Sequence, residues 1–306
     1  MKQTAGIHHI TAIVGHPQEN ADFYTNVLGL RLVKKTVNFD DPQTYHLYFG
    51  NEQAQPGTII TFFPWSNGSK GTIGSGQVGI TTYAVPAGSL PFWEKRLSTK
   101  EVDYVNTTRF DENVLQFEDV HGLKLELVER EEGPLNSWSN NGISAEKAIK
   151  GFAGAVLFSA NPKATIQTLT DTMGLTFLKE EADVVRLKAV GDLGNTIDIP
   201  LESSRPGDMG VGTVHHIAWR AEDEADHKDW LQHIKHSGFQ VTDIKDRNYF
   251  KALYFREYGG ILFEIASDTP GFTVDESQDT LGQKLKLPEH YEPARERLER
   301  ILPPIN

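Results

Sequence analysis

Two strands of closely matching sequence each carry a pair of histidines. The segment GIHHITAIV runs from Gly6 to Val14, and TVHHIAWRA runs from Thr213 to Ala221, about two hundred residues later. A neutral imidazole is the side chain that most often binds metal ions in proteins. The 306-residue chain contains no cysteine, so a metal here must be held by histidine, aspartate or glutamate. The paired histidines are therefore candidates for a metal site.

The elements that carry these strands recur four times along the chain. Each copy has an apolar strand, an amphipathic helix that ends near a glycine, and three more short strands, which makes a βαβββ unit of roughly 55 residues. A unit of this size cannot close its own core, so the units must pack in pairs. We predict an α+β fold with modules one and two in residues 1–131, modules three and four in 150–268, and a tail with a helix in 269–306.

Alignment of the four units identifies two positions where the modules differ in ways that matter for chemistry. In the first strand the aligned residues are His9, Gly79, Gly154 and His216. In the last strand, four residues after a glycine, they are Thr61, Glu126, Asp198 and Glu264. The histidines are thus confined to modules one and four, whereas the last-strand position is polar in every module.

The way the modules pair decides which of these residues meet. Pairing one with four gathers His9, His216 and Glu264. Thr61 then stands at the fourth place as a weak ligand. Pairing one with two and three with four, which sequence adjacency favours, would separate the histidines and place His9 with Glu126. Two histidines and one carboxylate with open positions are the ligands of non-haem Fe(II) oxygenases, so the ligand count favours one with four.

The histidine pairs also have an ordinary interpretation, because a lone histidine at a strand start is more often a hydrogen-bonded structural residue. Matching repeat positions favour a metal, and so does Glu264 within the apolar run ILFEIA, since an unpaired buried carboxylate is costly. Neighbouring side chains of a strand point to opposite faces, so we expect His8 and His215 to face away from the site. Thr11, two residues after His9, should share the face of that histidine.

Four segments, HHITAIV, FYTNVLGL, VHHIAW and LYFREYGGILFE, resemble the vicinal oxygen chelate superfamily, which includes glyoxalases and extradiol dioxygenases. The resemblance covers residues 6 to about 268. It implies four βαβββ modules that form two cupped mixed-sheet barrels. It also implies that His9, His216 and Glu264 are the metal ligands.

The segment 253–264 is similar to the extradiol dioxygenase signature. The matching residues are Tyr254, Glu257, Gly260 and Glu264, whereas Tyr258 replaces the usual proline. The histidine expected before Tyr254 is absent, and Arg247 occupies that neighbourhood. Together with HHxT at the first site and HH at the second, these departures resemble the hydroquinone ring-cleaving branch of the superfamily.

This branch implies roles for six further residues. Arg247, always charged, could hold a phenolate or an oxygen-derived anion beside the metal, although KDRN also fits a surface arginine. Tyr254 and His46 are candidates for moving protons. The alternative for Tyr254 is packing in the core, and the alternative for His46 is a half-exposed structural histidine. The Thr11 hydroxyl could reach a ligand or a bound oxygen, whereas His8 and His215 are expected to support the ligands from behind or to pack between strands.

We therefore expect a dioxygenase that uses Fe(II) and O2 to cleave a hydroquinone or catechol-like ring, with Mn(II) or another divalent metal able to take the same ligands. One alternative is a glyoxalase-like isomerase or lyase, which usually has four protein ligands. Another is a metal-free protein that binds an aromatic compound or drug and thereby confers resistance.

Charge and hydropathy limit the kinds of molecule that this protein is expected to bind. The chain has 42 acidic and 30 basic residues, a net charge of -12 and no run of basic residues, which argues against nucleic acid and anionic membranes as partners. It lacks a signal-peptide pattern and any run of 18 apolar residues, so we expect a cytoplasmic protein. The expected partners are a small aromatic substrate and O2, and a homo-oligomer stays open.

Overall fold

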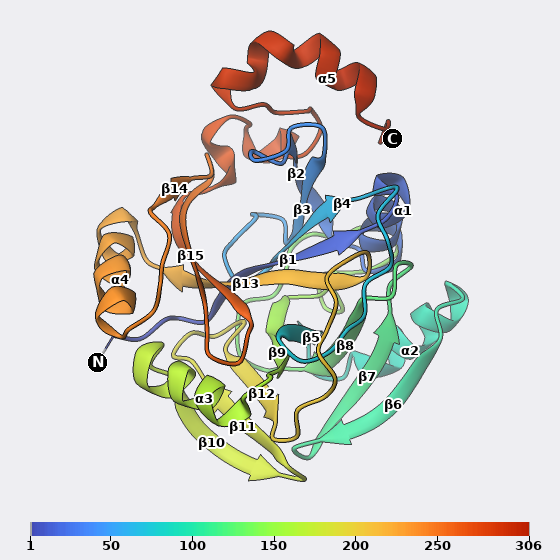
Figure 1. The fold of residues 1–306 in the computed structure, drawn as a ribbon. Coiled ribbons are helices and arrows are strands. Elements are labelled where there is room, and N and C mark those ends of the chain that lie inside the picture. The colour runs from blue at the N-terminus through green and yellow to red at the C-terminus, as the bar shows by residue number, and fades with distance from the viewer. Residues whose placement is uncertain (1, 306) are drawn as a thin grey trace.

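The computed structural model describes residues 2–305 and contains the four predicted modules in order (Figure 1). Module one consists of β1 (Ile7–Val14), α1 (Pro17–Asp22), the π-helix η1 (Phe23–Val27), β2 (Arg31–Val37), β3 (Tyr45–Gly50) and β4 (Ile59–Pro64). Module four consists of β13 (Thr213–Ala221), α4 (Glu224–His236), β14 (Lys245–Asp246), β15 (Phe250–Arg256) and β16 (Leu262–Pro270).

The two middle modules repeat the same order of elements. Module two consists of β5 (Gln77–Val85), α2 (Leu90–Thr99), β6 (Tyr104–Arg109), β7 (Glu112–Glu118) and β8 (Lys124–Glu129). Module three consists of β9 (Gly151–Phe158), α3 (Pro162–Gln167), the π-helix η2 (Thr168–Thr172), β10 (Thr176–Glu181), β11 (Val184–Lys188) and β12 (Thr196–Pro200).

The strands form two curled eight-stranded mixed sheets. One has the order β14-β15-β16-β13-β1-β4-β3-β2 and joins module four to module one. The other has the order β10-β11-β12-β9-β5-β8-β7-β6 and joins module three to module two. The predicted pairing of module one with module four is confirmed, and the alternative pairing of one with two and three with four is wrong. The division into 1–131 and 150–268 stays a prediction about segments of the sequence.

The antiparallel pairing of β1 with β13 at the centre of the first sheet contains two β-bulges. Ile7 lies opposite Trp219 and His9 opposite Ala218, so His8 is an extra residue in β1. The register also shifts between Thr11, opposite His216, and Ala12, opposite Val214, which makes His215 the extra residue in β13. A bulge places two residues opposite one and re-aims their side chains. The first histidine of each pair is therefore a bulge residue.

The second sheet has bulges at the corresponding places, and they correct the alignment of the repeats. The β5–β9 register shifts between Val78 and Ile80, so Gly79 corresponds to the bulge residue His8. Thr82 pairs with Glu126 as Thr11 pairs with Thr61, which makes Ile80 the counterpart of His9. The prediction that Gly79 occupies this place is wrong by one residue, because module two has no histidine in this strand that would mark the register.

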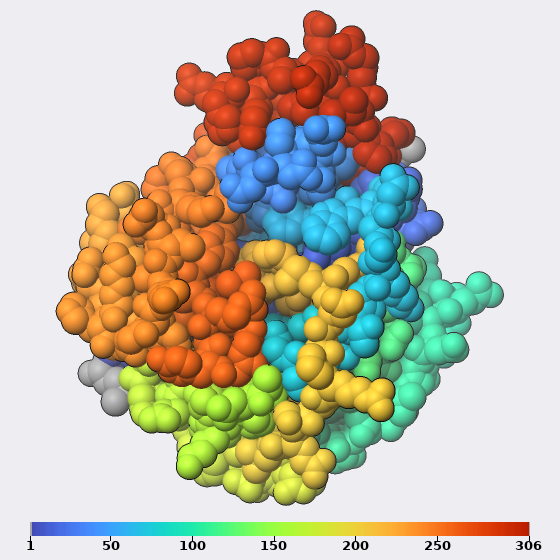
Figure 2. All heavy atoms as spheres, viewed as in Figure 1, coloured from blue at the N-terminus to red at the C-terminus, as the bar shows by residue number. Residues whose placement is uncertain are grey.

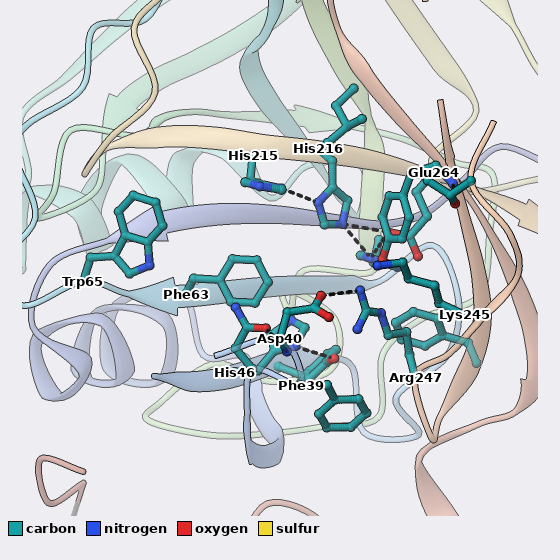
Figure 3. Close-up of a pocket in the computed structure, with 17 residues that line it drawn as sticks. Phe39, Asp40, His46, Phe63, Trp65, His215, His216, Lys245, Arg247 and Glu264 are labelled. Carbon is teal, nitrogen blue, oxygen red and sulfur yellow. Dashed lines mark hydrogen bonds and ion pairs between the residues drawn. The ribbon is translucent and has the colours of Figure 1, made fainter. Parts of the chain in front are cut away.

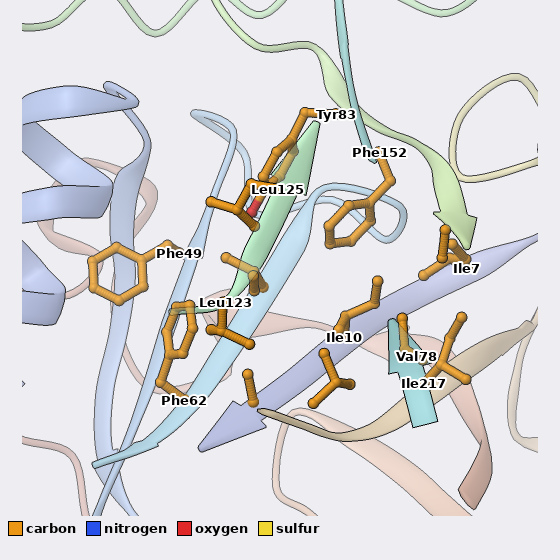
Figure 4. Close-up of a cluster of buried hydrophobic side chains, with 14 of the residues drawn as sticks. Ile7, Ile10, Phe49, Phe62, Val78, Tyr83, Leu123, Leu125, Phe152 and Ile217 are labelled. Atoms are coloured by element: carbon orange, nitrogen blue, oxygen red, sulfur yellow. The ribbon is translucent and has the colours of Figure 1, made fainter. Parts of the chain in front are cut away.

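The main hydrophobic core lies between the sheets and under the helices, and two smaller clusters of buried apolar residues accompany it within residues 2–305. Ile10 and Ile217, on the central strands of the first sheet, are fully buried and lie near Val78 and Phe152 of the second sheet (Figure 4). Apolar side chains on this face of β1 and β13 bind the sheets together through the hydrophobic effect. The opposite face is thereby left to line the cup of the first sheet.

The C-terminal tail covers the open edge of the first sheet at β2. Lys34 is fully buried and its Nζ lies 2.5 Å from carboxylate oxygens of both Asp275 and Glu276. Figure 2 shows the tail, in red, against the blue atoms of module one. It contains the short 3₁₀ helices η3 (Phe272–Val274), η4 (Gln278–Thr280) and η5 (Glu289–Ala294) and the predicted helix, α5 (Arg295–Ile301).

Within residues 2–305, none of the helices combines the length and the apolar character that crossing a bilayer requires.

Charged side chains close the cup of the second sheet. Glu126 is fully buried and accepts hydrogen bonds from Arg109 Nη1 and Nη2 at 2.8 and 2.6 Å. Arg109 Nε also donates to Asp198, 2.7 Å away, and Arg186 Nε donates to the other oxygen of that carboxylate at 2.7 Å. Two arginines thus neutralise the two carboxylates at the last-strand positions, and the remaining cavity is only about 10 Å³.

Replacing Arg109 by alanine is expected to lower the free energy of unfolding by about 3 kcal/mol, because Glu126 and Asp198 would stay buried without the cation they share. Urea denaturation followed by tryptophan fluorescence measures this loss. The control is Lys188→Ala, which removes a half-exposed partner of Glu132 and should change stability little. Equal losses in the two variants would contradict a stabilising role for the buried network.

Candidate metal centre and its cavity

His9, His216 and Glu264 meet at the centre of the first sheet, on β1, β13 and β16. Figure 3 shows His216 and Glu264 of this cluster. Each offers one ligand atom, and the three atoms lie within 4.8 Å of one another. Glu264 Oε2 lies 2.8 Å from His216 Nε2 and 3.5 Å from His9 Nε2, and the two Nε2 atoms are 3.3 Å apart. The tertiary structure thus brings together the three predicted ligands, although His9 and Glu264 are 255 positions apart in the chain.

The chemistry of this cluster fits a divalent cation. All three side chains are at most 5% exposed, and neither oxygen of Glu264 accepts a hydrogen bond from the described residues. Burial lowers the pKa of His216 despite the neighbouring carboxylate, which favours a neutral ring with a free lone pair. A carboxylate buried beside the neutral ring of His216 is costly without a counter-charge, and a metal ion coordinated by all three groups supplies one.

In each histidine pair the two rings contact each other through their Nδ1 atoms. His8 Nδ1 lies 2.9 Å from His9 Nδ1, and His215 Nδ1 lies 2.8 Å from His216 Nδ1. Burial lowers the pKa of His8 well below its usual range and that of His215 to about 3, so both rings are neutral at pH 7. If the Nε2 atoms of His9 and His216 keep their lone pairs for a metal, their Nδ1–H groups donate to these neighbours.

This arrangement corrects the expectation that His8 and His215 face away. His215 lines the same cavity as His216, and Figure 3 shows the two rings side by side. His8 is 2% exposed and packs against Phe250, with ring centroids 5.3 Å apart. Strict alternation fails because each of the two histidines is the extra residue of a β-bulge.

A cavity of about 380 Å³ opens beside the three candidate ligands, which is a suitable size for a small ligand. Aromatic side chains form much of its wall, and polar groups project among them. The aromatic residues are Phe39, Tyr48, Phe63, Trp65, Phe250 and Tyr254, and the polar residues include Asn38, Asp40, His46, His215, Lys245 and Arg247. Asp40, Lys245 and Tyr48 were not identified from the sequence.

Arg247 lies at the mouth of this cavity, not on an open surface, because its side chain is only 17% exposed. Its Nη2 donates to Asp40 at 2.8 Å, which connects module four to the β2–β3 connection of module one (Figure 3). Its guanidinium lies 5.8 Å from the centre of the Tyr254 ring. Burial and the charge of Glu264 raise the pKa of Tyr254, so this phenol stays protonated.

His46 lines the cavity as predicted, but both of its ring nitrogens are engaged. Nδ1 lies 2.8 Å from the Tyr48 hydroxyl, and Nε2 lies 2.8 Å from Thr61 Oγ1. Thr61 Oγ1 in turn lies 2.8 Å from Thr11 Oγ1. The Thr11 hydroxyl therefore contacts Thr61, which stands at the place that corresponds to Glu264 in module four.

Tyr48 could have been found in the sequence. The tripeptide Leu-Tyr-Phe occurs at 47–49 and again at 253–255, where it contains the predicted Tyr254. In the structure Tyr48 pairs with Thr61, and Tyr254 pairs with Glu264. The two tyrosines therefore occupy equivalent positions in modules one and four.

Comparison with known proteins identifies relatives along the whole chain. The model of the Glyoxalase/Bleomycin resistance protein/Dioxygenase superfamily matches residues 6–127 and 151–265. The provisionally named ring-cleaving dioxygenase MhqO of Bacillus subtilis (strain 168) is 58% identical over 304 residues, which cover 99% of this chain and 97% of that protein. The chlorohydroquinone/hydroquinone 1,2-dioxygenase of Sphingobium indicum is 33% identical over 313 residues, with coverage of 98% and 97%.

A solved structure supports the same relationship. The crystal structure of a provisionally assigned dioxygenase from Bacillus subtilis matches with a TM-score of 0.99 at 57% sequence identity, and covers 100% of this chain and 99% of that one. The family match includes all four modules, and the relatives align along nearly their full length. The chain therefore belongs to the glyoxalase/bleomycin resistance protein/dioxygenase superfamily, as its histidine-bearing strands and its segment 253–264 predicted.

Proposed function

We propose that this protein is a ring-cleaving dioxygenase that uses Fe(II) and O2 to open a hydroquinone or catechol-like aromatic ring. The observation that carries the proposal is the convergence of His9, His216 and Glu264 on one side of a largely aromatic cavity. Two histidines and one carboxylate leave coordination positions open for a substrate oxygen and for O2. The relatives named as ring-cleaving and hydroquinone dioxygenases support this choice.

The bound Fe(II) would supply the redox chemistry that lets O2 react with an aromatic ring. The residues of the chain bind and orient the reactants. The aromatic walls exclude water and hold the ring, while Arg247 places a permanent positive charge beside the site where a phenolate is bound. Tyr254 is protonated and can donate a hydrogen bond or a proton next to Glu264.

The main rival function is a glyoxalase-like isomerase or lyase. Enzymes of that kind usually present four protein ligands, whereas the fourth place here holds Thr61, whose hydroxyl already contacts His46 and Thr11. A metal-free binding protein is less well supported, because it would leave the buried carboxylate of Glu264 without a counter-charge. We place the activity in the cytoplasm, in keeping with the acidic, cysteine-free chain.

Oxygen uptake tests the proposed function. Protein reconstituted anaerobically with Fe(II) should consume one O2 per hydroquinone or catechol on exposure to air, and yield a ring-opened product that carries both oxygen atoms. An oxygen electrode and mass spectrometry of products made under ¹⁸O2 follow these changes. Absence of uptake with every dihydroxybenzene, despite stoichiometric iron, would favour the isomerase class. Mn(II) in place of Fe(II) shows which ion supports the reaction.

Substitution of Glu264 by glutamine is expected to abolish stoichiometric metal binding, because the neutral amide removes the only carboxylate of the cluster. Anaerobic titration with Co(II), followed by visible absorbance, should give one ion per wild-type chain and none per variant at micromolar protein. The matched control is Glu126→Gln, which changes the carboxylate at the equivalent position of module two and should leave Co(II) binding intact. Unchanged binding by E264Q would contradict this ligand assignment.

Substitution of His215 by phenylalanine is expected to weaken Co(II) binding by about 10- to 100-fold, because the His216 Nδ1–H would lose its acceptor. Asparagine at this position keeps an acceptor oxygen and should lose less affinity. Competition against a chelator measures these differences. His233→Phe, on the remote helix α4, serves as a control for the loss of an imidazole. Wild-type affinity in H215F would show that the contact between neighbouring rings does not support the ligand.

A further inference from the structure

Two tyrosines flank the candidate metal centre in a nearly symmetric way. Tyr48 lies on β3 opposite Thr61, and Tyr254 lies on β15 opposite Glu264. In the order of the sheet, β3 and β15 are equally distant from the central pair β1–β13. Both side chains line the same cavity. The cavity is therefore bordered by one phenol from module one and one from module four.

The environment of Tyr48 holds its ring in one place. The side chain is 1% exposed and packs against Phe272, with ring centroids 5.1 Å apart, and against His46 at 4.1 Å. Its hydroxyl lies 2.8 Å from His46 Nδ1. His46 is held in turn by Thr61, and Thr61 by Thr11, with 2.8 Å between the polar atoms at each step. This chain of contacts runs from the cavity into the buried strands β4 and β1.

The Tyr48 hydroxyl oxygen can accept a further hydrogen bond besides its contact with His46. A phenol has one proton and two acceptor lone pairs. If Tyr48 donates to His46 Nδ1, both lone pairs remain, and if it accepts from Nδ1–H, one lone pair remains. In either orientation the oxygen can accept a further hydrogen bond from a group in the cavity. Burial raises the pKa of Tyr48 well above its usual value, which keeps the phenol neutral.

We propose that Tyr48 is a positioning residue that accepts a hydrogen bond from the substrate ring hydroxyl that is not bound to the metal. The inference rests on the proposed function, since it names a second hydroxyl on the ring. Tyr254 and Arg247 serve the module-four side of the cavity, next to Glu264, and Tyr48 serves the module-one side. His46, with both nitrogens occupied, orients the Tyr48 hydroxyl and does not itself contact the substrate.

The role proposed for Tyr48 explains why a threonine stands at the place of a fourth metal ligand. Thr61 occupies the place of a fourth ligand, and its hydroxyl is committed to His46 and Thr11. The position that could have ligated the metal instead supports the residue that selects the substrate. The expected preference is for rings with two free hydroxyl groups over rings in which one hydroxyl is replaced by an atom that cannot donate.

A binding cycle tests the proposal without turnover. Protein loaded with Zn(II) is titrated anaerobically by calorimetry with hydroquinone and with 4-fluorophenol, in which fluorine of similar size replaces one hydroxyl. Wild type should bind hydroquinone more tightly. Tyr48→Phe should weaken hydroquinone binding by about tenfold, a typical effect of one hydrogen bond, and 4-fluorophenol binding by less than about twofold. Thr61→Val should reduce the same preference in part, with Zn(II) binding retained.

The control is Tyr83→Phe, which removes a buried hydroxyl of module two that has no hydrogen-bond partner among residues 2–305 and should leave both affinities unchanged. The proposal would be overturned if Y48F weakened the binding of hydroquinone and 4-fluorophenol equally, or if the wild type did not prefer hydroquinone. Oxygen uptake by the Fe(II)-loaded wild type is measured in parallel. Uptake without a Tyr48-dependent preference refutes only the role of Tyr48, whereas the preference without uptake refutes ring cleavage and leaves hydroxyl recognition standing.

Discussion

The antiparallel contact between β1 and β13 is the interaction on which the rest of the site depends. It joins strands about two hundred residues apart and places His9 and His216 with their Nε2 atoms 3.3 Å apart. Apolar residues on the far face of the same strands anchor them to the second sheet, so the position of the histidines is determined by the core. Both strands contain a β-bulge within this contact. The bulges bring the ring of His8 against that of His9 and the ring of His215 against that of His216.

The two sheets accommodate buried carboxylates in different ways. Each places carboxylates deep in a sheet, where an uncompensated charge is costly. In the second cup Arg109 and Arg186 neutralise Glu126 and Asp198 and fill the space. In the first cup the imidazoles of His9 and His216 flank Glu264 and leave a cavity beside it. The same scaffold thus yields a closed ion-pair network in one half and an open site suited to a cation and an organic ligand in the other.

Local rules predicted parts of this site and failed at identifiable points. Strand alternation placed His8 and His215 on the wrong face, and ungapped alignment matched Gly79 instead of Ile80 to His9. The first error arises because a bulge adds a residue to a strand without any distinctive sequence. The second arises because the first strand of module two has no histidine that would mark the register. Only the repeated Leu-Tyr-Phe tripeptide marks Tyr48 in the sequence, and this tripeptide lies outside the first and last strands that carry the candidate ligands.

The sequence by itself determined the four repeated modules, the superfamily, and the candidate ligands His9, His216 and Glu264. These features are readable because periodic apolar patterns and polar exceptions to them are local properties of a chain. Only the tertiary structure decided that the histidines of each pair touch, that Arg247 meets Asp40 across the cavity mouth, and that His46 is committed to Tyr48 and Thr61. Those contacts depend on strand register and on the curvature of the sheet, which no single segment of the sequence encodes.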